Sequence, residues 1–224
     1  MDALRTLLSE YDVIAAFWMT IKLAVLSALG SLVIGTVVAV CRVSPVAVLQ
    51  WFGLTYVTLV RNTPLTLIVF FCAFGMSNTL GLTLAPTIIE NNFRWGVVAL
   101  SIYHASFVAE ALRSGINTVP QGQAEAARAL GLAFMPTLST IILPQAFRGA
   151  IAPLGNTLIA LTKNTTVVAT IGVAEAAYVM RSMLEFNISL LYAIFIIMAA
   201  GFVILTLPVG IFFTYLSRKL TVQR

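Results

Sequence analysis

Long apolar segments determine what this chain can fold into. A helix that crosses the hydrocarbon core of a bilayer needs about 20 mainly apolar residues. Four segments have this character, at about residues 17–41, 54–76, 95–112 and 190–216. Inside a bilayer the backbone must satisfy its own hydrogen bonds, so each segment is expected to be helical. The sequence therefore predicts an all-α integral membrane protein.

A fifth segment, at about 149–173, is long enough to cross a membrane but contains several polar residues. We expect a helix to about residue 162, an irregular polar turn, and a short helix near 167–180. Such a break is tolerated at membrane depth only where it is buried or lines a cavity. The alternative is an ordinary span that ends at Lys163 and is followed by an outer loop. The interrupting residues are Pro153, Asn156, Lys163, Asn164, Thr165 and Thr166.

Composition agrees with a membrane protein. Only 9% of the 224 residues are charged and 60% are hydrophobic, whereas soluble domains carry about 25% charged residues. We therefore expect residues 1–224 to form a single transmembrane domain in contact with lipid. The net charge of +5 is spread along loops, which does not favour binding to nucleic acid.

The distribution of Lys and Arg predicts the orientation of the spans. Five spans place the two termini on opposite sides, and cytoplasmic loops carry more basic residues than outer loops. The bias favours an N-terminus outside and a C-terminus in the cytoplasm. In that orientation the cytoplasmic residues are Arg42, Arg113, Arg128, Arg148, Arg218, Lys219 and Arg224, and the outer ones are Arg5, Arg94 and Arg181.

Small side chains recur at four-residue spacing in the first span. Ser27, Ser31 and Gly35 share one face of the predicted helix. Such a stripe lets a second helix approach closely. We expect it to pack against another span of the same subunit.

The longest cytoplasmic segment, at about 113–148, is predicted to contain two helices. Pro120 suits a first helical turn, and Gly131 can take the positive φ that often ends a helix. Pro136 is expected to restart a second helix, which Pro144 ends or kinks.

The first of these two helices has an unusual surface. Ala124, Ala126 and Ala127 leave a surface with little side chain, flanked by the charges of Glu125 and Arg128. Small residues flanked by charges suit a helix that docks in the groove of another protein. A helix lying on the membrane surface would instead need large apolar residues along one face, and this helix lacks them.

The stretch EAARALGLAFMPTLSTIILPQAFR resembles the EAA loop of ABC importer permeases. The matching positions are Glu125, Ala126, Ala127, Gly131, Ile141, Leu143 and Pro144.

Three further stretches are similar to motifs of the polar amino acid permeases, the family for histidine, glutamine, glutamate and arginine uptake. They are YVTLVRNTPL, LSIYHASFVAEALRSGINTVPQGQ and NTLIALTKNTTVVATIGVAE, in the same order as in that family. The resemblance runs from about residue 20 to 185.

This resemblance implies a type I ABC importer-like permease in a bacterial plasma membrane. Such a subunit pairs with a similar or identical permease and receives substrate from an extracytoplasmic amino-acid-binding protein. It binds two ATPase subunits through its EAA helices. The implied coupling residues are Gln123, Glu125, Ala126, Ala127, Arg128, Leu130 and Gly131.

The chain has no GxxxxGK[ST] sequence, which is the loop that holds nucleotide phosphates in many ATPases. We therefore expect no enzymatic activity and no cofactor in this chain, with ATP and magnesium bound by the partner.

Two basic residues within spans are candidates for substrate binding. Ionisable residues in a membrane are costly and usually functional, and both Arg61 and Lys163 suit the carboxylates of an amino acid. Alternatively, Arg61 caps carbonyls at Pro64 or pairs with Glu110, and Lys163 reaches out to the interface. With their polar neighbours, the candidates are Arg61, Thr63, His104, Ser106, Lys163, Asn164 and Thr165.

The chain departs from the family pattern at two places. Asn164 stands where Asp is frequent, which makes a cationic substrate less favoured and glutamate or aspartate more favoured, with glutamine next. His104-Ala105-Ser106-Phe107 replaces Ser-Gly-Ala-Tyr. His104 could contact substrate, but a single histidine in a span more often bonds a neighbouring helix. We also expect Glu110 to pair with Arg113 or Arg61 and not to touch substrate.

The leading hypothesis is thus a permease subunit of an ATP-driven importer for glutamate or a similar amino acid. An ion-gradient transporter or channel would need paired acidic residues within spans, and only Glu110 is available. A membrane scaffold without transport would not need Arg61 or Lys163.

Overall fold

The computed structural model describes residues 9–220, and all regular structure in that range is helical. Arg5 and Arg224, which contribute to the predicted orientation, lie outside the described residues. Three helices are long and apolar enough to cross a membrane, and five crossings result if each of two bent helix pairs counts as one. The all-α class and the expected range of spans are confirmed.

The centre of the bundle is formed by α2 (Val13–Val43) and α5 (Ile88–Ile116). The small residues of α2 face α5: a Cβ atom on Gly35 would lie 2.6 Å from Val108 Cβ and 2.8 Å from the Ala105 carbonyl oxygen. Ser27 also donates a hydrogen bond to the carbonyl of Val97. The predicted packing of this stripe within the subunit is confirmed.

The second predicted span is divided. The structure has α3 (Ala47–Asn62), α4 (Leu65–Phe70) and the π-helical η1 (Phe71–Thr79), with a bend of 104° between α3 and the later pair. Proline disfavours helical backbone in the residue before it, and Thr63 is accordingly extended. The segment 54–76 is therefore not one straight helix, and Pro64 is the reason.

The fifth segment, at about 149–173, breaks later than predicted, because the helix continues through polar residues 163–166 and the 55° bend comes between Ile171 and Ala176. α8 (Leu143–Asn164) includes Pro153 without ending there, and the 3-10 helix η3 (Thr165–Ile171) follows. Gly172 then takes a left-handed conformation with φ of 81°. The next helix, α9 (Ala176–Phe186), begins later than predicted because Glu175 caps it by accepting a hydrogen bond from Tyr178 N.

The second helix of the cytoplasmic pair is not separate from the span. Short α7 (Phe134–Thr137) and the π-helical η2 (Leu138–Ile142) run directly into α8. Pro144 is the second residue of α8, which directly follows the π-helical η2, and the helix continues past Pro144 to Ile171. The prediction that Pro144 ends or kinks this helix is therefore wrong.

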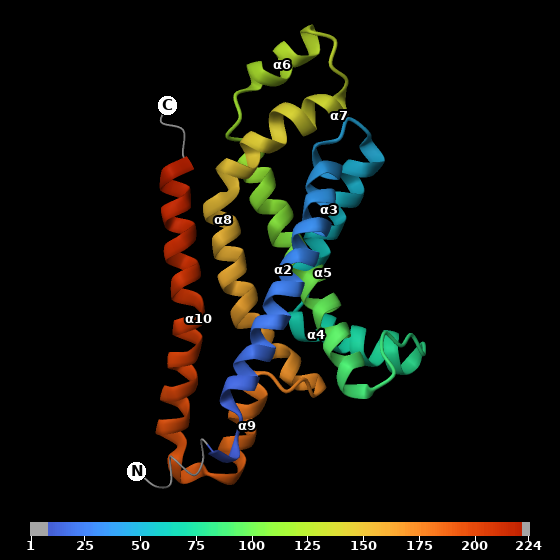
Figure 1. Cartoon of the computed structure of the whole chain (residues 1–224). Helices are drawn as coiled ribbons and strands as arrows, with labels where there is room; N and C mark the ends of the chain where they lie inside the picture. Colours follow the sequence, from blue (N-terminus) through green and yellow to red (C-terminus); the bar gives the residue numbers. More distant parts are fainter. Residues whose placement is uncertain (1–8, 221–224) are drawn as a thin grey trace.

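Figure 1 shows the order of the long helices across the bundle, with α8 between α5 and α10 (Leu191–Leu220). α6 (Gln121–Ala129) lies at the same end as the last turn of α10, which we call the α6 end. α9 and the first turns of α2 and α10 lie at the opposite α9 end, and the short 3-10 helix η4 (Ile188–Leu190) joins α9 to α10.

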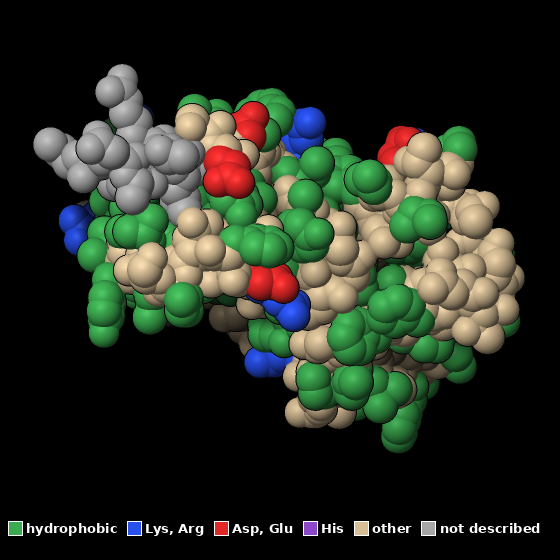
Figure 2. All heavy atoms as spheres, turned by 90° about the horizontal axis from the view of Figure 1, so that it is seen from below, with side chains coloured by type: hydrophobic (Ala, Val, Ile, Leu, Met, Phe, Trp, Pro, Cys, Tyr) green, Lys and Arg blue, Asp and Glu red, His purple; other side chains and the backbone are tan. Residues whose placement is uncertain are grey.

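The exterior of the bundle is strongly apolar. Viewed toward the α9 end, hydrophobic side chains cover much of the surface between a few separate charged groups (Figure 2). Only 11% of the most apolar stretch of α10 is buried, and Ile204, Leu207 and Ile211 are exposed. Apolar surface on this scale needs lipid or another subunit against it.

Candidate functional site

The candidate site is centred on three aromatic side chains in the middle of α5. His104 is 1% exposed, and its ring centroid lies 5.1 Å from that of Tyr103 and 6.1 Å from that of Phe107. Tyr103 and Phe107 are four residues apart and share a helix face, and their rings, with centroids 5.2 Å apart, both lie against the imidazole. The rings hold His104 in one place.

Both nitrogens of His104 have a polar partner. Nδ1 lies 3.0 Å from the carbonyl oxygen of Leu100, and because a carbonyl only accepts, Nδ1 must carry the proton. Nε2 lies 3.1 Å from Nδ2 of Asn164, which donates to it. The expected bond from His104 to a neighbouring helix is therefore present, and it joins α5 to the last turn of α8.

Arg61 reaches the same aromatic face from the last turn of α3. Its guanidinium carbon lies 5.1 Å from the centroid of Phe107, a distance at which the ring attracts a cation. Arg61 is exposed, and in residues 9–220 it has no hydrogen bond or ion pair. It neither caps carbonyls near Pro64 nor pairs with Glu110, so both alternative roles from the sequence are wrong.

The end of α8 supplies the next polar groups. Lys163 is exposed and has no ion pair in the described part of the chain. The Oδ1 atom of Asn164 is not buried and has no hydrogen-bond partner among residues 9–220. Two free cations and a free amide oxygen are suited to the carboxylate and ammonium groups of an amino acid.

Three predicted hydroxyl groups bond to local backbone instead. Thr63 donates to the carbonyl of Leu59, Ser106 to that of Tyr103 and Thr165 to that of Thr162, all within 2.8 Å.

Ser106 and Thr165 are also fully buried, so neither offers a free group in this conformation. The structure thus places Phe107 against both Arg61 and His104, and His104 in turn bonds to Asn164. It does not bring the hydroxyls of Ser106 and Thr165 to the same surface. Sequence reasoning missed Tyr103 and Phe107 as contributors, although their four-residue spacing predicts that the two rings share a helix face.

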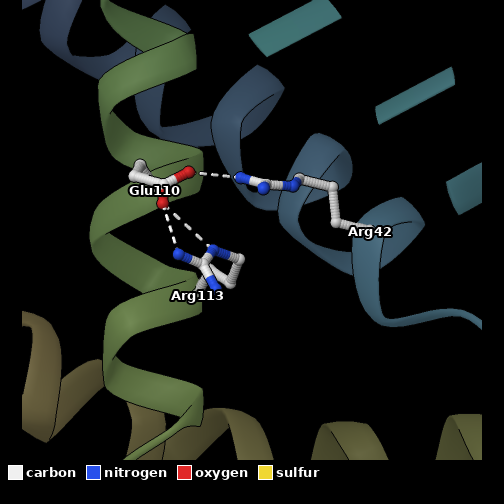
Figure 3. Close-up of polar contacts among 3 residues, drawn as sticks. All are labelled: Arg42, Glu110 and Arg113. Atoms are coloured by element: carbon white, nitrogen blue, oxygen red, sulfur yellow. Dashed lines mark hydrogen bonds and ion pairs between the residues drawn. The ribbon is translucent and has the colours of Figure 1, made fainter. Parts of the chain in front are cut away.

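An ion cluster lies nearer the α6 end (Figure 3). Glu110 of α5 accepts from Arg113 Nη2 at 2.6 Å and from Nε at 3.0 Å. Its other carboxylate oxygen pairs with Arg42 in the last turn of α2. The pairing with Arg113 is confirmed and the one with Arg61 is wrong. Arg42 was missed because it is 68 residues away in sequence.

The coupling residues lie on and after α6 at its own end of the bundle. Gln123, Glu125 and Ala126 are exposed, as are Arg128, Leu130 and Gly131. Ala127 is 2% exposed, so its assignment to the exposed surface is wrong. Ala124, three residues earlier, is also half-buried, because this spacing turns both toward the bundle.

Behind α6 is a cavity of about 840 Å³. It is lined by α6, the α2–α3 corner and the end of α5, including Ser44, Asn117 and Arg128. α6 itself contacts α7 and η2. Gly131 follows it with φ of 81°, as predicted. The helix is therefore held away from the membrane-spanning core by short connections.

Comparison with known proteins decides the family. Residues 31–222 match the family described as the binding-protein-dependent transport system inner membrane component. The chain belongs to this family. As a binding-protein-dependent inner membrane component, it is a permease subunit of an ABC importer that works with a separate ATPase.

Two relatives show how close the match is. The chain is 52% identical over 218 residues to the glutamate transport system permease protein GluC of Corynebacterium glutamicum, covering 95% of this chain and 96% of the relative. It is 37% identical to the probable glutamine ABC transporter permease protein GlnM of Bacillus subtilis, covering 91% of each.

Solved structures show the same fold for this inner membrane component. A crystal structure of an amino acid ABC transporter with histidines matches with a TM-score of 0.79 and 28% identity, covering 92% of this chain and 93% of that one. An inward-facing MetNI methionine ABC transporter matches with a TM-score of 0.74 and 18% identity, covering 94% and 96%. The family excludes our alternatives of an ion-gradient transporter, a channel and a scaffold.

Proposed function

We propose that this permease subunit moves glutamate, or a closely related amino acid such as aspartate or glutamine, into the cytoplasm. The observation that carries the proposal is the 52% identity to glutamate permeases of two Corynebacterium species along almost the whole chain. Arg61, over the Phe107 ring of α5, and Lys163, at the end of α8, support it, because both are exposed cations without an ion pair in the described residues. Cations in an apolar region favour an anionic substrate.

The proposed binding set remains the one expected from the sequence. Arg61 and Lys163 bind carboxylates, and Asn164 contacts the amino acid backbone. Thr63, His104, Ser106 and Thr165 complete the set. His104 and the hydroxyls of Ser106 and Thr165 are buried, so they can contact the substrate directly only if the helices around them move.

The proposed partners are those of an ABC importer permease. A pair of ATPase subunits binds ATP and magnesium, so this chain needs no cofactor of its own. A second similar or identical permease and lipid cover the apolar exterior, and an extracytoplasmic binding protein delivers the substrate.

In this assembly the α6 end faces the cytoplasm. The basic residues at this end support the orientation, because cytoplasmic segments carry more Lys and Arg than outer ones. In the described chain they are Arg42, Arg113, Arg128, Arg148, Arg218 and Lys219. The N-terminal end of α2 then lies outside. Closure of the ATPase pair moves α6, and the direct connection of α7 and η2 to α8 carries that movement to the span that bears Lys163 and Asn164.

The test is transport by the reconstituted complex. The permease is purified with its ATPase and binding protein and placed in liposomes, and ATP-dependent uptake of radiolabelled glutamate is measured with unlabelled aspartate, glutamine and arginine as competitors. We expect glutamate uptake that requires ATP and is weakly inhibited by arginine. Uptake without the ATPase, or strong preference for arginine, would contradict the proposal.

A further inference from the structure

The two positions at which the chain departs from the polar amino acid permease pattern contact each other. His104 lies in α5 and Asn164 ends α8, 60 residues later, and the Nε2 and Nδ2 atoms of the two side chains are 3.1 Å apart. The two residues therefore act as a unit. Which of the two side chains donates the hydrogen bond determines the role of that unit.

The contact accepts only one orientation of the Asn164 amide. Because the proton of His104 lies on Nδ1 and is donated to the carbonyl of Leu100, the Nε2 atom presents a lone pair. Only the NH₂ group of Asn164 can donate to it. An aspartate at 164 would place a second acceptor there, so a neutral histidine suits asparagine and not the more frequent acid.

The imidazole of His104 cannot rotate to suit the opposite orientation of the Asn164 amide. His104 is 1% exposed, its Nδ1 is held by the Leu100 carbonyl, and Tyr103 and Phe107 pack against the ring. With its NH₂ group held by His104, Asn164 must direct Oδ1 away from the imidazole. That oxygen is the one that is unburied and without a partner in the described residues.

We propose that His104 is a positioning residue, which fixes the Asn164 amide so that its carbonyl oxygen accepts a hydrogen bond from the α-ammonium group of the transported amino acid. The inference rests on the proposed function. Arg61 and Lys163 attract carboxylates and repel an ammonium group. A neutral acceptor on Asn164, next to Lys163 in the chain, gives the ammonium group a partner and so distinguishes an amino acid from a plain dicarboxylate.

The experiment compares glutamate with glutarate, which has the same two carboxylates and no ammonium group. The purified permease–ATPase complex is used in detergent without the binding protein, so only the permease site is measured. Equilibrium binding of radiolabelled glutamate and its displacement by glutarate are determined for wild type, His104→Leu and His104→Gln. Glutamine keeps an acceptor that can reach Asn164, whereas leucine has none.

We expect His104→Leu to weaken glutamate binding about tenfold, the effect of losing one hydrogen bond to a charged group, and to leave glutarate binding within about twofold. His104→Gln should keep most of the preference. Asn164→Leu should resemble His104→Leu, and combining the two should cause little further loss, because both remove the same interaction.

Ser101→Ala is the matched control. Ser101 is a buried polar residue on α5, but its hydroxyl bonds to the carbonyls of Val97 and Ser27. Its removal should not alter the glutamate-to-glutarate ratio. If the leucine variant does not fold, His104→Asn replaces it, since the shorter side chain cannot reach Asn164 and should also lose the preference.

The outcomes separate the two proposals. A wild-type complex that binds no glutamate contradicts the proposed function. A wild type that binds glutamate, with His104 variants that bind it equally well or lose both ligands equally, overturns the positioning role. So does a wild type that binds glutarate as tightly as glutamate.

Discussion

Arg42 and Glu110 form an ion pair that connects the last turn of α2 to α5, beside the bidentate contact from Arg113 to the same carboxylate (Figure 3). The side chains of Arg42 and Glu110 are only 13% and 29% exposed. Glu110 thus pairs with two guanidinium groups near the α6 end of the two central helices, and the cluster keeps a net positive charge. This relationship makes Glu110 a structural residue.

Replacing Glu110 with Gln should destabilise the protein by about 1–3 kcal/mol, because Arg42 would keep its partly buried charge without a partner. Thermal unfolding of the purified protein in detergent measures this loss. Glu90→Gln is the control, since Glu90 and Arg94 pair on the surface with about half of each side chain exposed, where a pair contributes about 0–1 kcal/mol. Equal effects of the two changes would refute the structural role.

Gly35→Ala should separate α2 from α5. The added methyl would meet Val108 and the backbone oxygen of Ala105 at under 3 Å, and overpacking of this kind costs about 1–3 kcal/mol. Gly122→Ala in α6 has no atom within 4 Å of the added methyl and should be neutral or slightly stabilising. A Gly35 variant as stable as the Gly122 variant would show that the two helices do not need this close approach.

Gly131→Asp should leave the protein in the membrane and lower ATP-dependent uptake at least tenfold. Gly131 has φ of 81° with open space around it, so the change strains the end of α6 and adds charge without a clash. Gly131→Asn separates the two effects, because asparagine adds a side chain of the same size in the same left-handed conformation but without the charge. Uptake at the wild-type rate in Gly131→Asp would count against coupling through α6.

Arg61→Ala should reduce glutamate uptake about tenfold without releasing the ATPase, because the guanidinium has no structural ion pair to lose among residues 9–220. Arg61→Lys should lose less, since it keeps the charge over Phe107 but not the planar fork. Uptake assays and co-purification of the ATPase measure the two effects. Unchanged uptake in Arg61→Ala would remove this residue from the site.

Glu175 offers a prediction about stability alone. It is fully buried, with Oε1 capping α9 through Tyr178 N at 2.9 Å and Oε2 without a partner in the described structure. Glu175→Gln keeps the cap and removes a carboxylate from a buried position, so stability should stay equal or rise. Glu175→Ala loses the cap and should cost about 1 kcal/mol. Thermal unfolding that ranks alanine above glutamine would contradict this account.

Local properties of the sequence determined the class of the protein and the main interruptions in its helices. The hydropathy of a segment is a sum over consecutive residues, so it predicts the apolar segments directly. Pro64 and Gly131 likewise act on the backbone next to them. A break in the fifth segment was also expected from its polar residues, but these residues continue the helix to Ile171, and the bend follows at Gly172 with its positive φ. The bounds shifted where a cap such as Glu175 set the start of a helix.

Only the tertiary structure decided which side chains meet. The contacts between Arg42 and Glu110, and between His104 and Asn164, join residues 68 and 60 positions apart, and they depend on how each helix is rotated against its neighbour. The same rotation turns Ala127 inward and places Arg61 over Phe107. Periodicity states which residues share a face, but packing against other helices selects the direction in which that face points.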